Sequence, residues 1–342
     1  MENKLKEALS QTTDTNHYLK KAQTADHPYL TDFEQVYSTY STCFPEEIKD
    51  WLSNKMLLNL NPFQEKQFIQ YACEATIVKH FADRFTNTIE IEKKINPNNQ
   101  KDVDLVFSDK GFTFNIEIKC SDFVQKEQID NKNTLKVQTI GRLPGLDKTL
   151  ADLQPILDQV SKKMNLDGTD IAKNMDNNLK DFLVSAHKKF NPNATDKELS
   201  ILSVSCNDAE DLQLWYYYMF KDQGLFTNES YFDTSKYENV DIVMLNNLYY
   251  KHSKYFNKQL LNSWDFDNSF VIVFSNPFAK KTKTDALNHF LSICRNFNQE
   301  YNDWFVPGTA EEEVKDSRKL ADFIKAELEE SQGIYLFEQS QK

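Results

Sequence analysis

The stretch DVDLVFSDKGFTFNIEIKC, residues 102–120, contains two apolar runs separated by a short polar segment. The first run covers Val103 to Phe107, and the segment Ser108 to Gly111 has the residue types that favour a tight turn. The second run follows at once and ends at Cys120. This pattern predicts a β-hairpin.

Three charged side chains are expected to converge on this hairpin. Glu117 and Lys119 lie two residues apart and therefore share one face of a strand, and strand pairing brings Asp104 beside Glu117. Charged groups are costly to bury unless they are paired or bind a metal. Magnesium prefers oxygen ligands, so Asp104, Glu117 and the backbone carbonyl of Ile118 form a suitable donor set. The hairpin thus predicts a Mg²⁺ site, which Mn²⁺ could also occupy, beside a phosphodiester.

Asp104 followed by Glu117-Ile118-Lys119 resembles the core signature of the PD-(D/E)xK nuclease superfamily. This superfamily includes restriction endonucleases and many DNA-repair and phage-defence nucleases. Val103 stands where many members have proline, at a position that varies among them. The resemblance implies hydrolysis of DNA phosphodiester bonds, with Lys119 stabilising the transition state. It covers a few motif positions and the order of elements, so it supports a superfamily and not a substrate.

The resemblance also implies an additional glutamate on the helix before the sheet, which is expected over residues 63–85. Tyr71 and Ile77 lie three residues before and after Glu74, so this carboxylate is on or beside an apolar stripe and is predicted to face the site. Glu65 lies nearer the helix start, where the helix dipole favours an acid, and is expected to be a solvated charge. Glu74 is the predicted fourth catalytic and metal-binding residue, with Glu65 as the alternative.

Two other interpretations stay open. Asp102 shares a face with Asp104 and competes with it, although the apolar strand continues directly after Asp104. Strand pairs with one acid and one lysine on an exposed face are also common and add only modest stability. In that case the chain is a non-catalytic scaffolding or protein-binding module on the same fold.

Composition places the chain among ordinary folded proteins. It has 342 residues, with 25 Phe, 15 Tyr and only 7 Gly. Its five cysteines are widely spaced and lie mostly in apolar runs, which predicts reduced thiols and neither a disulfide framework nor a zinc site. No apolar run is long enough to cross a bilayer, and the first residues lack a signal core, so we expect a cytoplasmic protein without a membrane partner.

The net charge of −12 argues against broad, nonspecific binding of nucleic acid. The charge is unevenly distributed, because residues 119–163 carry eight Lys and Arg against six Asp and Glu. Basic side chains in a predicted polar loop after Lys119 are candidates for contact with the DNA backbone. These are Lys126, Lys132, Lys136 and Arg142.

The remaining sequence predicts an α/β fold with a restriction-endonuclease-like mixed central sheet flanked by helices. We expect an N-terminal helical extension over 1–60, a nuclease core over 61–300 and a C-terminal helical segment over 301–342. Predicted core elements after the hairpin are helices near 147–164 and 169–189, and strands at 201–206, 241–245 and 270–274. The continuous hydrophobicity of these strands indicates a sheet that is covered on both faces.

The segment NNLYYKH, residues 246–252, follows a buried strand at a position where α/β proteins often place functional loops. It could bind nucleic acid by tyrosine stacking. The favoured interpretation is that Tyr249 and Tyr250 pack a helix, while Lys251 and His252 are solvated.

The sequence as a whole predicts a Mg²⁺-dependent endonuclease that acts on DNA, and RNA or single-stranded or branched DNA stays open as its substrate. A homodimer is compatible with cutting both strands of a duplex. A role in restriction or phage defence, with a protein partner in such a system, follows from the resemblance alone.

Overall fold

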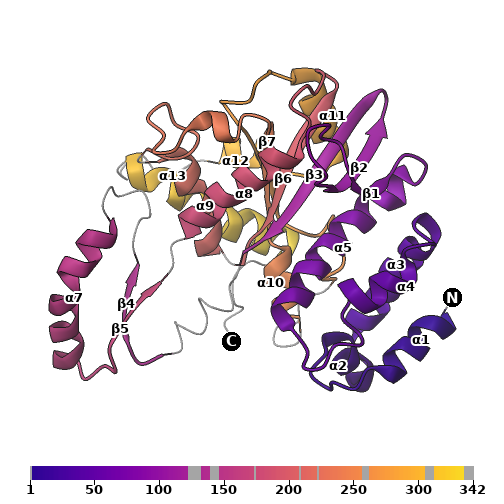
Figure 1. Ribbon diagram of the computed structural model, residues 1–342, viewed down its shortest axis with the longest axis horizontal. Helices are drawn as coiled ribbons and strands as arrows, with labels where there is room; N and C mark the ends of the chain where they lie inside the picture. The colour runs from indigo at the N-terminus through magenta and orange to yellow at the C-terminus, as the bar shows by residue number, and fades with distance from the viewer. Residues whose placement is uncertain are drawn as a thin grey trace.

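The computed structural model of the chain has a six-stranded mixed sheet that is flanked by helices (Figure 1). It describes residues 2–121, 132–138, 146–172, 175–207, 209–221, 223–255, 262–304 and 312–334. The helices in these ranges are α1 (Glu2–Gln11), α2 (Tyr18–Ala25), α3 (Pro28–Cys43), α4 (Ile48–Asp50), η1 (Trp51–Lys55), α5 (Glu65–Phe85), α7 (Leu146–Lys163), α8 (Met175–Lys189), α9 (Ala209–Phe220), η2 (Thr234–Lys236), α10 (Leu248–Ser253), α11 (Thr284–Ile293), α12 (Asn298–Asp303), α13 (Glu312–Phe323) and η3 (Ile324–Ser331). The strands are β1 (Glu90–Lys93), β2 (Val103–Asp109), β3 (Phe112–Cys120), β4 (Leu135–Gln138), β5 (Thr169–Ala172), β6 (Glu198–Ser205), β7 (Ile242–Asn246) and β8 (Val271–Ser275).

The main sheet has the strand order β1-β2-β3-β6-β7-β8. The first three strands form an antiparallel meander, and β3, β6 and β7 run parallel to one another. β8 closes the far edge in the antiparallel direction. The predicted α/β class, with a mixed central sheet between helices, is therefore confirmed.

The two faces of the sheet are covered by different helices. On one face, Phe81 of α5 stacks 4.6 Å from Phe107 of β2, and Phe290 of α11 lies 5.6 Å from Phe114 of β3. Helix α8 covers the opposite face, and its Phe182 ring stacks against Trp215 of α9. Every residue of β7 is buried, as its uninterrupted apolar sequence predicts.

The hairpin predicted from the sequence is present, with longer strands and a tighter turn. Asp109 pairs with Phe112, so only Lys110 and Gly111 connect the strands. Both connecting residues have positive φ, 47° and 82°, as a two-residue type I′ turn requires. The turn fixes the register, in which Leu105 lies opposite Ile116.

The N-terminal helices are joined to the sheet domain through a buried histidine. Nδ1 of His252, on α10, lies 2.9 Å from the hydroxyl of Tyr29 on α3, and its Nε2 lies 3.0 Å from the hydroxyl of Thr76 on α5. Burial holds the pKa of His252 well below its ordinary value, and the nearby Lys251 charge adds to this shift. The imidazole is therefore neutral and connects three segments that are distant in the sequence.

The prediction that Lys251 and His252 are solvated was wrong. Both side chains are buried, because α10 packs against α5 and brings them into the interior. Lys251 is satisfied by oxygen atoms of a nearby loop, since its Nζ donates to the backbone carbonyls of Asp265 and Asn268 at 3.0 and 3.2 Å. Tyr249 and Tyr250 are buried, as predicted.

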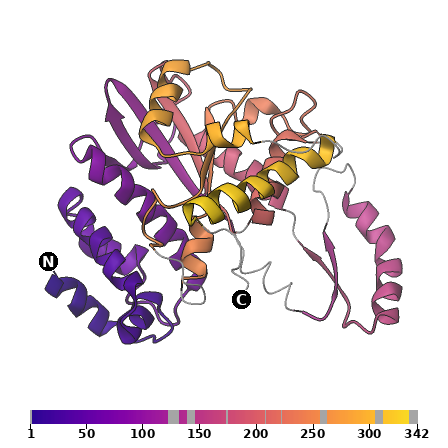
Figure 2. The ribbon, with the colours of Figure 1, turned by 180° about the vertical axis from the view of Figure 1, so that it is seen from behind.

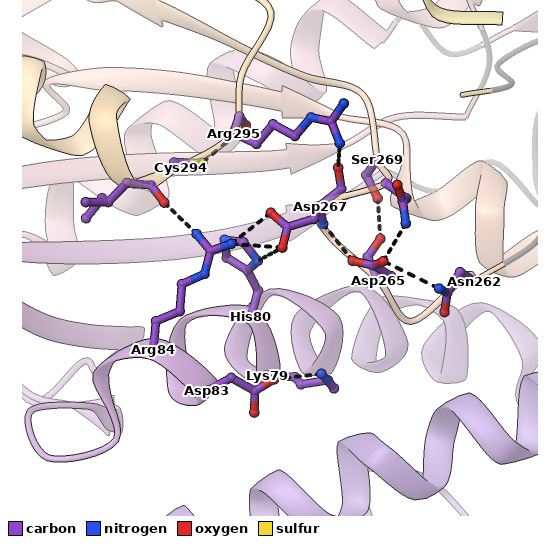
Figure 3. Close-up of polar contacts among 12 residues, drawn as sticks. Lys79, His80, Asp83, Arg84, Asn262, Asp265, Asp267, Ser269, Cys294 and Arg295 are labelled. Atoms are coloured by element: carbon purple, nitrogen blue, oxygen red, sulfur yellow. Dashed lines mark hydrogen bonds and ion pairs between the residues drawn. The ribbon is translucent and has the colours of Figure 1, made fainter. Parts of the chain in front are cut away.

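A second set of polar contacts ties the C-terminal part of α5 to the loop before β8 (Figure 3). The guanidinium of Arg84 donates to both carboxylate oxygens of Asp267, at 3.0 and 2.8 Å, and to the carbonyl of Ile293 at 2.8 Å. Arg295 donates to the backbone carbonyl of Asp267 at 2.9 Å. Together these contacts hold α5 against the half of the sheet that lies far from the hairpin.

The described residues 132–138 and 146–172 form a separate unit, here called the arm, which contains β4, α7 and β5. β4 and β5 pair in parallel, and α7 provides the crossover between them. Both views show the arm standing apart from the main sheet and its helices (Figures 1 and 2). The arm is inserted between β3 and α8.

The arm corrects two predictions. The loop expected after the hairpin contains β4, and the helix expected over 169–189 is divided into β5 and α8, which begins at Met175. Both arm strands have only four residues and pair with each other across more than thirty positions, as in Leu135 with Thr169. β4 alternates apolar and polar residues, but each strand covers only four positions, so the local signal is weak.

The helix predicted over 309–331 is found as α13, which continues directly into η3. α13 packs on α9, and its Leu320 and Phe323 are fully buried. Figure 2 shows this helix lying across the molecule on the side that faces away in Figure 1. Within the ranges given above, no helix combines the length and the apolar character needed to cross a bilayer.

Candidate active site

The hairpin brings two carboxylates together on neighbouring strands. Continuing the register from the Leu105–Ile116 pair places Asp104 opposite Glu117. Oδ2 of Asp104 accepts a hydrogen bond from the backbone N–H of Ile118 at 2.6 Å, which fixes this carboxylate against β3. Glu117 is fully buried and Asp104 is half-buried.

Two lysines surround the buried Glu117. Nζ of Lys119 lies 2.5 Å from its Oε1, and Nζ of Lys189, the last residue of α8, lies 2.7 Å from Oε1 and 2.8 Å from Oε2. Lys119 and Lys189 are 24 % and 16 % exposed, so both ammonium groups sit at the boundary between interior and solvent. Asp104, Glu117, Lys119 and Lys189 are called the acid–lysine cluster below.

Burial and charge together shift the pKa values in this cluster. Burial, followed by the negative charge of Asp104, raises the pKa of Glu117 to about 7, although Lys119 and Lys189 act in the opposite direction. Burial alone would lower the pKa of Lys119, but the charges of Glu117 and Asp104 outweigh it and the pKa is raised. Lys119 therefore stays protonated at neutral pH, whereas Glu117 gains and loses its proton near pH 7.

Glu74 on α5 lies within electrostatic range of this cluster. Burial raises its pKa to about 7, and the charge of Asp104 adds to the shift. Its Oε1 pairs with Nζ of Lys55 at 3.1 Å, and the same ammonium lies 2.9 Å from a carboxylate oxygen of Glu92 on β1. The side chain of Glu74 is 19 % exposed. Glu74 thus flanks the cluster from the helix that the sequence indicated.

The two competing acids lie in different settings. Glu65 is hydrogen-bonded by the hydroxyl of Tyr18, so it forms part of the packing of the N-terminal helices and is not merely solvated. Asp102 is half-buried and precedes the first residue of β2, Val103. The acid with the largest effect on the pKa of Glu117 is Asp104.

The donor set of the cluster fits a hard cation. Oε1 of Glu117 is buried, and among the described residues no donor makes a hydrogen bond of good geometry to it, although two ammonium nitrogens lie close. The described residues contain no group of three or more His, Cys, Asp or Glu side chains arranged to bind a metal. Magnesium retains several of its waters, so Asp104, Glu117 and the carbonyl of Ile118 are chemically sufficient as its protein ligands.

The four basic residues predicted to contact DNA are only partly described. Lys126 and Arg142 lie outside the described residues. Lys132 is on the arm, where its Nζ pairs with Asp170 at 3.0 Å. Lys136 is exposed and belongs to strand β4, so its predicted location in a loop was wrong. The structure thus places the two described lysines on the arm and away from the acid–lysine cluster.

A hollow of about 200 Å³ lies between α5 and the loop residues Trp264 to Asp267. Its three acids are all engaged: Asp83 pairs with Lys79, Asp267 pairs with Arg84, and Asp265 accepts hydrogen bonds from the loop. Figure 3 shows His80 and Arg84 of α5 reaching Asp267, whereas Lys79 and Asp83 pair with each other along α5. The polar contacts around the hollow therefore join α5 to the loop before β8.

Three charged residues around the site were not identified from the sequence, namely Lys55, Glu92 and Lys189. Lys189 ends a predicted helix, where a lysine is expected for its interaction with the helix dipole alone. Only the packing of α8 on the sheet reveals that its ammonium reaches Glu117. Lys55 and Glu92 depend in the same way on contacts between separate elements.

The chain matches no protein-family model, no curated protein and no solved structure at a significant level.

Proposed function

We propose that the chain is a divalent-metal-dependent nuclease of the PD-(D/E)xK type that hydrolyses DNA phosphodiester bonds. The observation that carries the proposal is the position of Asp104 opposite Glu117, with Lys119 in contact with the same carboxylate. Two acids and one ammonium on adjacent strands are the groups that a metal-assisted phosphodiesterase requires.

The order of elements supports a restriction-endonuclease-like core. Helix α5 precedes the antiparallel strands β1, β2 and β3, and the chain then returns through α8 to β6, which pairs in parallel with β3. The acids of the hairpin and the acid of α5 are carried by the elements on which the resemblance depends, and the charge of Asp104 helps to raise the pKa of Glu74. The arm interrupts this order without entering the sheet.

Each side chain has a distinct part in the proposed reaction. Asp104, Glu117 and the carbonyl of Ile118 would hold the ion, which when bound supplies the Lewis acidity that phosphoryl transfer needs. The ammonium of Lys119 is partly exposed and protonated, so it can stabilise negative charge that develops on the scissile phosphate. Glu74 would orient an attacking water through its carboxylate.

The groups that neutralise the negative charge of Glu117 must change when the ion binds. Lys119 and Lys189 neutralise this buried carboxylate in the structure described here. A bound cation would compete with them for the same oxygens, which would turn Lys119 toward the substrate. In this proposal Lys189 is a positioning residue, because it touches Glu117 and not the reacting atoms.

Cleavage assays with matched variants test this proposal. Supercoiled plasmid, duplex, single-stranded and methylated oligonucleotides, and RNA would be incubated with the protein and Mg²⁺ or Mn²⁺. Asp104→Asn, Glu117→Gln and Lys119→Met should each reduce the rate by about 10²-fold or more. Asp102→Asn, a neighbouring acid changed in the same way, should retain the rate of the unaltered protein. Thermal melting would establish that each variant is folded.

Either of two results would contradict the assignment. One is cutting by Glu117→Gln or Lys119→Met at the unaltered rate, and the other is the absence of metal-dependent cleavage on every substrate. If Asp102→Asn loses activity while Asp104→Asn retains it, the metal-binding acid is Asp102 and not Asp104.

A scaffolding function is favoured by one specific observation. The lysines already neutralise Glu117, so the acid–lysine cluster is stable as a structural ion-pair network without a metal. Isothermal titration with Mg²⁺ separates the two functions, because a scaffold would show no heat that depends on Glu117. The acidic net charge of the chain would then suit a basic protein partner.

A further inference from the structure

Helix α7 of the arm presents a stripe of large apolar side chains to solvent. The stripe consists of Leu153, Ile156 and Val160 on α7 and of Met164, which directly follows the helix and whose backbone N–H donates to the carbonyl of Val160 at 3.0 Å. Its two most exposed members, Ile156 and Met164, are 57 % and 58 % exposed. At about 100° per residue, all four point within a narrow arc of the helix. Large apolar side chains scattered singly need no explanation, but an aligned set marks an interaction surface.

The arm has no core of its own to explain this stripe. Among its side chains that the structure describes, only the small polar Ser161 is buried, and it hydrogen-bonds to the carbonyl of Gly168 at 2.8 Å. Leu150 and Leu157 face the two strands but remain partly exposed. Parallel strands normally require cover on both faces, and two strands alone are marginally stable in water. The arm therefore needs another surface to complete it.

The charges beside the stripe indicate which surface this is. Asp152 and Lys163 are exposed and lie on the same flank of the stripe, at its two ends. If two copies of α7 pack antiparallel about a twofold axis, equal flanks face each other. The pairing that sets Leu153 against Met164 and Ile156 against Val160 then also sets Asp152 of one copy against Lys163 of the other.

We infer that α7 is a self-association surface, and that its occupant is the α7 stripe of a second copy of this chain packed antiparallel. One register satisfies both the apolar contacts and the charge contacts, which is a property of a helix that pairs with itself. The association then covers the apolar side chains that the stripe exposes. The inference is independent of nuclease activity, because it concerns only the association of two chains.

The first experiment measures the mass of the full chain by sedimentation equilibrium. A stripe of four side chains makes a small interface, so concentrations from about 1 to 100 µM are appropriate. We expect a concentration-dependent dimer. Ile156→Glu with Met164→Glu should weaken it by at least about tenfold, since each glutamate would be buried against an apolar side chain of the other copy, Val160 or Leu153. A monomer across this range, or an undiminished dimer in the double variant, overturns the inference.

A charge-reversal series tests the antiparallel register and does not depend on the folding of the apolar variant. Lys163→Glu should weaken the dimer several-fold, and combining it with Asp152→Lys should restore the association. Lys162→Glu is the matched control, because Lys162 is exposed and points away from the stripe. Equal weakening by Lys162→Glu and Lys163→Glu, or no recovery in the double reversal, overturns the proposed packing. Thermal melting of every variant shows that association alone has changed.

Discussion

Nζ of Lys189 lies 2.8 Å from Oε2 of Glu117, although the two residues are 72 positions apart. The contact joins the end of α8 to the middle of the signature strand β3. It also spans the arm, since the arm is inserted between these two elements. The packing of α8 on the sheet is thus part of what determines the protonation of the central carboxylate.

Lys189→Met should move metal binding and cleavage to higher pH. The ammonium of Lys189 lowers the pKa of Glu117, so its removal should raise this pKa above its value of about 7. The pH profiles of Mg²⁺ affinity and of cleavage would show the shift. Lys188→Met, which removes the exposed neighbouring lysine, is the control and should leave the profiles in place. Identical profiles for the two variants would contradict the role of Lys189.

Stability should fall as the pH rises from about 5 to about 7, and Mg²⁺ should reverse this fall. The pKa of Glu117 is raised in the folded protein from 4.5 to about 7, so the unfolded chain loses its proton first and gains relative stability over that range. Metal binding requires the ionised form, so Mg²⁺ should raise the melting temperature more at about pH 8 than at about pH 6. Glu117→Gln should show a smaller fall with pH and a smaller effect of Mg²⁺. An equal Mg²⁺ effect at both pH values would contradict this linkage.

Gly111→Ala should destabilise the hairpin that aligns Asp104 with Glu117. Gly111 has a φ of 82°, which a residue with a Cβ atom adopts with strain, and we expect a cost of about 1 kcal/mol in the free energy of unfolding. Lys110→Asn is the matched control, because asparagine tolerates the positive φ of 47° at that position. Urea unfolding would measure both effects. A neutral Gly111→Ala would show that the turn is not constrained in this way.

Lys283→Met should be strongly destabilising, although Lys283 does not belong to the acid–lysine cluster. Lys283 and Asp241 are 6 % and 7 % exposed and pair at 2.8 Å, and Asp241 also accepts the backbone N–H of Ser200 at 2.6 Å. Removing the lysine leaves a buried carboxylate without its counter-charge, at a cost of about 3–5 kcal/mol. Adding Asp241→Asn should recover most of this loss in urea unfolding. No recovery would mean that packing of the lysine stem, and not its charge, is responsible.

The regular elements of the fold were predictable because their signals are local. The hairpin follows from two apolar runs and a turn, and the continuous apolar segments at 242–246 and 271–275 are strands of a covered sheet. Helix α5 was evident from its length and its apolar stripe. In these cases burial against neighbours reinforces what the local pattern favours.

The arm and α10 were less predictable because non-local contacts decide them. Strands β4 and β5 are stabilised by each other, and neither has a strong strand pattern alone. Lys251 and His252 appear suited to solvent by residue type, yet backbone carbonyls, Tyr29 and Thr76 satisfy them in the interior. Residue type gives an average preference for burial, whereas a specific hydrogen-bond partner can reverse it.

For the candidate site, the sequence predicted which residues share the hairpin but not what neutralises them. Alternation along β3 and pairing with β2 are enough to associate Asp104, Glu117 and Lys119. The contributions of Lys189 and Lys55 require knowledge of how α8 and η1 pack.

The hydrogen bonds that join His252, Tyr29 and Thr76 bear on any attempt to divide the protein into fragments. A fragment that starts at residue 61 would remove Tyr29, leave one imidazole nitrogen without its partner and uncover the aromatic rings of Tyr255 and Trp264 that pack on Tyr29. The helices before residue 61 and the sheet should consequently melt in a single transition. Shortened versions of the protein should keep these helices in order to remain folded.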